Sequence, residues 1–398
     1  MEKNNRGLRI IFALILPFSA LFYSIKNYRN RDAKWFFVFG LSFLGYTINI
    51  EGDIERYRDI FYEMKNVPWS QLLDDILSLK QGDFYVSLVA KFIGIFVENH
   101  YFYIAVLIAV FAYFYFSIVK LFIDFLPKKL DFFVIQLFFA FTLFISLRNF
   151  ISIRFYTATL VFIYGMLKYL FSDKKKYLVF VFISPIIHIS FLIGLPFVLF
   201  YVFFKKKYKI AFFLMISCYF IGQSSAVDFL NKSLNSNTEN AINSKIKTYA
   251  SEEGIEYLNN RYASEEINSK LLILNTSKQI SNIFISIGIL LILFFQKRVL
   301  KEDINIKFFT LILVLWALAN LLREVSNGSR FTILYLFTAL GFFLFLQVNN
   351  NLNNHLIQYL KFGIIIVIAY GFMSIVASNV LFKTNYFISN YFVEFFVF

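Results

Sequence analysis

The chain has 398 residues, of which 59% are hydrophobic, 21% aromatic and only 16% charged. A soluble globular protein is about 25% charged, so this composition excludes an ordinary soluble domain. The apolar runs are continuous, approach the roughly 20 residues that a helix needs to cross a bilayer, and lack the alternation of membrane strands. We therefore predict an all-α polytopic membrane protein, a single integral domain over residues 1–398, with roughly 11 to 13 membrane segments including short or re-entrant helices.

The net charge of +14 does not indicate a nucleic-acid partner. Lys and Arg cluster in short loops between apolar runs, which is the positive-inside pattern rather than one polyanion-binding face. The single cysteine, Cys218, excludes a disulfide within one chain, and three widely spaced histidines give no zinc pattern. We expect no metal and no cofactor.

Basic loops alternate with the apolar runs and predict the topology. We expect the following Lys and Arg clusters to face the cytoplasm: residues 26–34, 128–129, 174–176, 205–209 and 297–307. The predicted spans are residues 8–24, 35–50, 101–123, 131–147, 153–171, 208–223, 280–296, 307–322, 331–348 and 362–377. An aromatic tail follows the last span.

Two polar segments are predicted on the outer side. Residues 51–83 are net acidic and are expected to form an outer loop with an amphipathic helix over residues 54–64, which places Ile54, Arg58 and Phe61 near one face and can lie along the membrane surface. Residues 224–278 are rich in Asn, Ser, Glu and Tyr and form the one other piece long enough for an outer loop or lid.

Two apolar runs are too short or too interrupted to be simple spans. Residues 84–97 contain Lys91 in the middle and are expected to be re-entrant or interfacial. Residues 177–204 have a basic loop on each side. A single crossing would place these two loops on opposite faces of the membrane. We predict two short halves that break near residues 185–190, enter the membrane and return.

Candidate functional residues lie at the predicted outer ends of the spans. An arginine within a span costs roughly 2.5–3.5 kcal/mol on insertion scales, so Arg148 and Arg154 indicate function. Both can face one cavity if Arg148 closes the loop and Arg154 opens the helix. Arg323 and Arg330 bracket a short polar loop and can close on that cavity from the other side, while His188 marks the break in residues 177–204.

Each of these residues also has a structural interpretation. Arg148 can bind lipid head groups at the interface, and His188 beside Pro185 can be a hydrogen-bonded structural residue. Asp53 is able to cap a helix that begins at Ile54. Glu324 can pair with a neighbouring arginine.

The order of several motifs resembles the EpsG family, over roughly residues 35–204. The residues that carry this resemblance are Gly52, Asp53, Tyr57, Arg148, Ala158, Lys174 to Lys176, His188 and Ser190, with Arg330 beyond that range. Members of this family are bacterial inner-membrane proteins of exopolysaccharide and capsule loci, regarded as Wzy-type polysaccharide polymerases. One departure is Asn149, where the family commonly has glutamine, which shortens the reach of that amide.

The resemblance implies a metal-independent glycosyltransferase of the inner membrane, whose active site faces the periplasm or cell exterior. It would transfer glycan from an undecaprenyl pyrophosphate donor to a sugar hydroxyl of a second lipid-linked repeat, with a chain-length regulator and a flippase as possible partners. The expected catalytic residues are Asp53, Arg148, Arg154 and His188. The expected substrate-binding residues are Tyr57, Asn149, Arg323, Glu324 and Arg330.

Other classes fit the residues less well. A transporter or flippase of a lipid-linked glycan or anion would favour inverted repeats and paired broken helices, and only one broken segment is evident. An O-antigen ligase would be expected to carry a catalytic histidine in the large outer loop, and residues 224–278 contain none.

Overall fold

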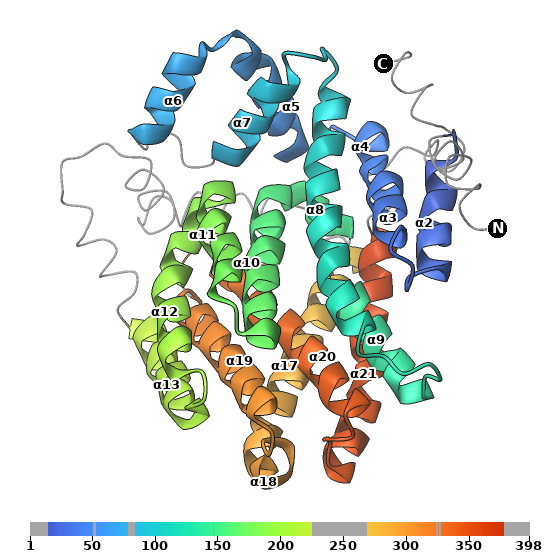
Figure 1. Cartoon of the computed structure of the whole chain (residues 1–398), viewed down its shortest axis with the longest axis vertical. Coiled ribbons are helices and arrows are strands. Elements are labelled where there is room, and N and C mark those ends of the chain that lie inside the picture. The colour runs from blue at the N-terminus through green and yellow to red at the C-terminus, as the bar shows by residue number, and fades with distance from the viewer. Residues whose placement is uncertain are drawn as a thin grey trace.

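The computed structural model describes residues 15–50, 53–78, 84–145, 147–224, 269–323, 325 and 328–377. These residues form a bundle of helices joined by short connections (Figure 1). Six helices are long and apolar enough to cross a membrane. They are α8 (His100–Ile123), α10 (Ile153–Ser172), α17 (Ser269–Phe294), α19 (Asp303–Leu321), α20 (Thr332–Val348) and α21 (Asn354–Ala377). The prediction of an all-α polytopic membrane protein is confirmed.

Shorter helices complete the bundle. The α-helices are α2 (Pro17–Lys26), α3 (Ala33–Ser42), α4 (Leu44–Thr47), α5 (Asp53–Asn66), α6 (Trp69–Leu77), α7 (Phe84–Ile93), α9 (Phe132–Leu143), α11 (Leu178–Ile187), α12 (Gly194–Phe204), α13 (Tyr208–Ser224) and α18 (Gln296–Val299). The 3-10 turns are η2 (Leu147–Ser152), η3 (Lys175–Tyr177), η4 (Ile189–Ile193) and η5 (Gly328–Phe331).

Helix α17 begins earlier than predicted. It starts at Ser269, so the last residues of the predicted outer segment 224–278 form its first turns. Their polarity is compatible with a helix because serine hydroxyls bond to carbonyls one turn back, as Ser277 does to Ile273 (2.8 Å) and Ser281 to Ser277 (2.8 Å). Residues 225–268 and 378–398, which include most of the predicted lid and the aromatic tail, lie outside the described residues.

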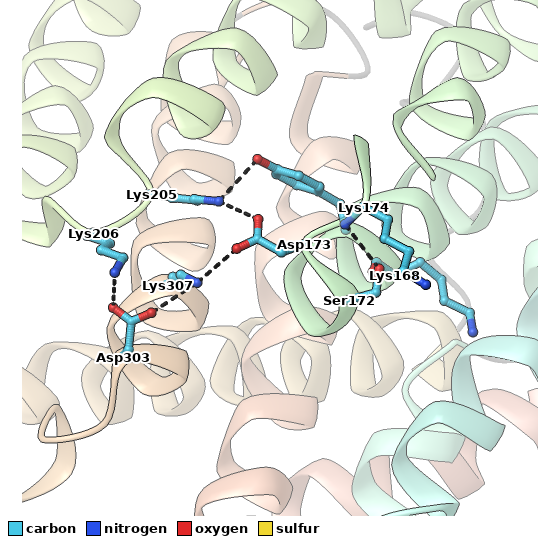
Figure 2. A network of polar contacts seen from close by, with 9 residues as sticks. Lys168, Ser172, Asp173, Lys174, Lys205, Lys206, Asp303 and Lys307 are labelled. Atoms are coloured by element: carbon cyan, nitrogen blue, oxygen red, sulfur yellow. Dashed lines mark hydrogen bonds and ion pairs between the residues drawn. The ribbon is translucent and has the colours of Figure 1, made fainter. Parts of the chain in front are cut away.

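The loops rich in lysine and arginine gather at one end of the bundle, which we call the basic end. Arg29 donates to the carbonyl of Pro127 (2.7 Å), which joins the loops after α2 and α8. Asp173, after α10, accepts from Lys205 and from Lys307 (3.2 Å), and Asp303 accepts from Lys206 (2.7 Å; Figure 2). Loops far apart in sequence therefore share one face, as the alternation of charge predicts.

Residues 177–204 form the predicted broken hairpin. Helix α11 contains Pro185, which lacks a backbone donor, and ends two residues later at Ile187. After the turn η4, helix α12 returns toward the basic end, where Lys205 pairs with Asp173. Since α11 also starts just after Asp173, the segment leaves the basic end and comes back to it.

Helices α5, α6 and α7 cover the opposite end (Figure 1). Helix α7 packs against α5, and Lys91 donates to the carbonyl of Lys65 (3.0 Å). With 10 residues, α7 is about 15 Å long, which is half the thickness of the hydrocarbon core. It is therefore not a span. Arg58, expected near the same face of α5 as Ile54 and Phe61, is partly exposed and pairs with Glu55 and Asp59.

Candidate active site at the end of the bundle opposite the basic loops

Helix α5 supplies the first two residues of the candidate site. Ile54, Tyr57, Phe61 and Met64 recur at three- and four-residue spacing and form its buried face. Tyr57 is fully buried, whereas Asp53, at the first residue of the helix, is half-buried. One turn of α5 therefore positions a carboxylate and a phenol hydroxyl together.

Arg154 lies against Tyr57, although the two residues are 97 positions apart in the chain. Its Nε donates to the Tyr57 hydroxyl (3.3 Å), and its guanidinium carbon lies 5.3 Å from the centre of the Tyr57 ring. Arg154 occupies the first turn of α10, where the helix dipole is also positive. The two positive contributions make this position attractive to an anion.

Asp53 approaches the same turn of α10. Its carboxylate accepts a hydrogen bond from the hydroxyl of Ser152 (3.4 Å). Ser152 precedes α10 in the N-cap position, but its side chain makes no capping hydrogen bond to the helix. The hydroxyl is instead used to join η2 to α5, so Asp53, Ser152 and Arg154 lie in one region.

Tyr57 remains a neutral phenol under physiological conditions. Burial is the largest influence and raises the pKa of its hydroxyl; the positive charge of Arg154 lowers this pKa, and the negative charge of Asp53 raises it. The net effect is an increase above the usual value. A neutral hydroxyl at this position accepts from Arg154 and keeps its own proton, and the expected contact of Tyr57 with substrate stays a prediction.

His188 lies at the break between α11 and η4. Its Nδ1 shares a hydrogen bond with the Ser190 hydroxyl (2.6 Å), and its ring meets Phe155 edge-to-face at 5.5 Å. The backbone at His188 is extended because the helix has ended. The imidazole is half-buried and oriented from two sides.

Phe155 connects the three elements that carry the site. Its ring contacts His188 on one side, Phe191 of η4 at 5.5 Å and Phe331 of η5 at 5.3 Å. Because Phe155 follows Arg154 and Phe331 follows Arg330, the contacts bring the start of α10, the tip of the hairpin and η5 together. Three segments that are remote in sequence thus meet at one place.

The other predicted site residues lie in η2, in η5 and just after α19. Arg148 and Asn149 lie in η2, where Asn149 is half-buried and the Arg148 side chain is outside the described residues, as is Glu324. Arg330 is half-buried in η5. The exposed Arg323 instead lies over the ring of Tyr219 at 5.9 Å. The expected role of Arg323 at the same site as Arg154 stays a prediction.

Sequence reasoning missed three residues at this site: Ser152, Ser190 and Phe155. Ser152 stands two positions before Arg154, and a serine at a predicted helix start is a recognisable N-cap. Ser190 entered only as part of the family motif, and its contact with His188 depends on the extended backbone of the break. Nothing in the sequence distinguishes Phe155 from the chain's other phenylalanines.

The arrangement offers a carboxylate, a guanidinium and an imidazole in one region. Their chemistry is that of a proton acceptor, an anion-binding group and an orienting or proton-carrying group. In the part of the chain that the structure describes, no three His, Cys, Asp or Glu side chains form a group able to hold a metal ion. The expected absence of a metal stays a prediction.

Comparison with known proteins identifies the family to which the chain belongs. A model of the EpsG family matches residues 33–393, so the similarity extends well beyond the residues 35–204 whose motifs carry it. A search of curated proteins and a search of solved structures each gave no significant match. Because the match spans nearly the whole chain, this protein is a member of the EpsG family.

Proposed function

We propose that this protein is a glycosyltransferase that polymerises lipid-linked oligosaccharide repeats of a capsule, an exopolysaccharide or an O-antigen. Membership of a family associated with polysaccharide polymerase-like function supports this class of reaction. The single observation that carries the proposal is the position of Arg154 in the first turn of α10, where it donates to the buried Tyr57 and stands two residues after Ser152, which donates to Asp53.

In the proposed reaction a sugar hydroxyl of one lipid-linked repeat attacks the anomeric carbon of another repeat. The new glycosidic bond forms as the bond from that carbon to undecaprenyl pyrophosphate breaks. The hydroxyl proton passes to the Asp53 carboxylate, and the pyrophosphate leaves with its negative charge stabilised by Arg154. Arginine suits this role because its planar fork binds phosphate oxygens bidentately and stays charged. Arg148 and Asn149 would act from η2, and Arg330 from η5.

His188 would orient a phosphate or carry a proton during departure of the lipid. Its Nδ1 shares a hydrogen bond with Ser190, which holds the imidazole in one orientation for either role. We place the protein in the bacterial inner membrane with the basic end in the cytoplasm, following the positive-inside rule. The site would then face the periplasm or cell exterior, where lipid-linked repeats serve as donors and a flippase and a chain-length regulator would be partners.

The test is polymerisation by purified protein in vesicles that contain a synthetic repeat on undecaprenyl pyrophosphate, without nucleotide sugar and with a metal chelator. We expect the wild type to lengthen the glycan and Arg154→Ala and Asp53→Asn to lose at least about 100-fold in rate. Arg58→Ala is the matched control, because Arg58 lies on the exposed face of the same helix α5 and makes only surface pairs.

Two results would contradict the proposal. One is normal polymerisation by folded Arg154→Ala protein. The other is transfer of labelled lipid-linked repeat across the bilayer with no lengthening, which is the behaviour of a flippase. Loss of activity on adding the chelator would separately refute the proposal that no metal is needed.

A further inference from the structure

A second group of polar and aromatic side chains lies among the membrane-spanning helices, away from Arg154. The Tyr335 hydroxyl of α20 hydrogen-bonds to Ser286 of α17 (3.1 Å), and the Tyr335 ring stacks on Trp316 of α19 at 5.1 Å with an interplanar angle of 8°. Arg323 follows the end of α19 and lies over the ring of Tyr219 of α13 at 5.9 Å. Three spans thus contribute to one cluster.

Asn282 gives this cluster an unsatisfied acceptor. It lies one turn before Ser286 on α17, so both side chains are on the same face, and Ser286 donates to the Asn282 backbone carbonyl (2.7 Å). The side-chain oxygen of Asn282 is buried and accepts no hydrogen bond from any residue that the structure describes. An unmet buried acceptor costs about 1–3 kcal/mol. Asn282 as a whole is half-buried, so part of its surface is open to a ligand although the amide oxygen itself is covered.

The chemistry of the cluster suits a sugar. Carbohydrates offer hydroxyls to amide and hydroxyl side chains and C–H faces to aromatic rings, and Asn282, Ser286 and Trp316 supply these partners. Two cations stand near these residues in the chain: Arg323 follows the end of α19 and lies over the Tyr219 ring, and Lys278 lies one turn before Asn282 on α17. A polar amide within a span is itself costly and indicates function. We therefore favour a glycan over a pyrophosphate as the ligand.

The cluster and the candidate active site adjoin the same short connection. Arg323 stands just after α19, and η5 begins five residues later and places Phe331 against Phe155. Two ligands at the two positions would therefore lie on either side of this connection. A polymerase must hold two lipid-linked repeats at once, and the two clusters offer two different chemistries.

We propose that Asn282, Ser286, Trp316, Arg323 and Tyr335 form a glycan-binding subsite for the oligosaccharide of one repeat. This inference rests on the proposed function, since the Arg154 cluster would hold the pyrophosphate of the other repeat.

Tryptophan fluorescence can test the subsite without measuring polymerisation. The chain has three tryptophans, and Trp35 and Trp69 are 50% and 41% exposed, so a variant with both changed to Phe reports on Trp316 alone. The probe is the set of phosphate-free oligosaccharides released by partial acid hydrolysis of the producing strain's own cell-surface polysaccharide. We expect a saturable change in emission, and Asn282→Ala and Tyr335→Phe should each weaken the apparent Kd about 5- to 10-fold.

Two variants serve as controls. Asn275→Ala removes an exposed amide from the same helix and should bind glycan like the parent. Arg154→Ala should also keep glycan binding while it loses polymerisation. The subsite is refuted if folded Asn282→Ala and Tyr335→Phe proteins bind like the parent, if no emission change occurs, or if inorganic pyrophosphate produces the same change and competes. If glycan binds as expected but no variant polymerises, the proposed function fails and the subsite stands.

Discussion

Replacing Tyr57 by phenylalanine isolates the hydroxyl that holds Arg154. The ring stays in its buried position on α5 and the contact with the guanidinium face is kept, but Nε of Arg154 loses an acceptor at 3.3 Å. Hydrogen bonds to charged groups contribute about 1.5–3 kcal/mol, and the length of this one places it near the lower limit. Arg154 is half-buried, so water replaces part of the loss. We expect a loss of about 1–1.5 kcal/mol of transition-state stabilisation, which corresponds to a roughly 5- to 12-fold lower kcat/KM.

The assay is lengthening of the lipid-linked repeat over a range of substrate concentrations, with the melting temperature measured in parallel. If Arg154 acts on the leaving pyrophosphate, kcat should fall more than KM rises, because the interaction strengthens as charge develops. Arg58→Ala on the same helix should leave both constants unchanged. The reasoning is refuted if Tyr57→Phe leaves kcat/KM unchanged, or if the loss in rate follows a loss of folded protein.

Two further predictions concern stability. The pKa of Asp173 is held below its usual value, chiefly by its hydrogen bond from Lys205. The Asp173 carboxylate therefore stabilises the fold at pH values above its unfolded pKa of about 4. This contribution is lost as the pH falls through the lower pKa of the folded state. Asp173→Asn should therefore lower the melting temperature by an amount that is constant from about pH 5 to pH 9 and shrinks below pH 4. Because the Asp173 side chain is 54% exposed, the loss of unfolding free energy should be at most about 1 kcal/mol. Gly222→Ala places a Cβ 2.2 Å from the Asn320 carbonyl oxygen, where α13 meets α19, and should lower the unfolding free energy by about 1–3 kcal/mol. Gly194→Ala should cost less, because its Cβ would lie 3.3 Å from the Phe162 side chain. A destabilisation by Asp173→Asn that grows toward low pH, or equal melting temperatures for the two glycine variants, would contradict these arguments.

The topology was predictable because it depends on local features. Lysine clusters recur between apolar runs, and the hairpin break follows from Pro185 and from basic loops on both sides. The exact start of α17 was not, because Ser277, in the polar segment 224–278, looks like a loop residue until its hydroxyl is seen to bond within the helix. Local polarity alone does not distinguish a polar loop from the polar first turns of a helix.

The candidate site was predictable as a set of residues but not as a set of contacts. Tyr57 and Arg154 are 97 residues apart, and their pairing depends on how α5 lies over the start of α10. Arg323 and Arg330 are close in sequence and were expected to act together. The turn between them brings Gly328 so near to the Leu322 carbonyl that a Cβ would lie 1.7 Å away, and such a close backbone approach cannot be read from sequence spacing.

The location of the site also follows from where the helices break. Turn η2 precedes α10, η4 interrupts the hairpin and η5 precedes α20; η4 and η5 meet at Phe155, three residues after η2 ends, through Phe191 and Phe331. Helix ends leave backbone groups without partners in the helix, and a bilayer core tolerates them only where protein or a wet cavity satisfies them. Collecting three such ends in one place therefore requires a polar environment there. This requirement is independent of family membership and places the polar chemistry at the same end of the bundle as Asp53 and Arg154.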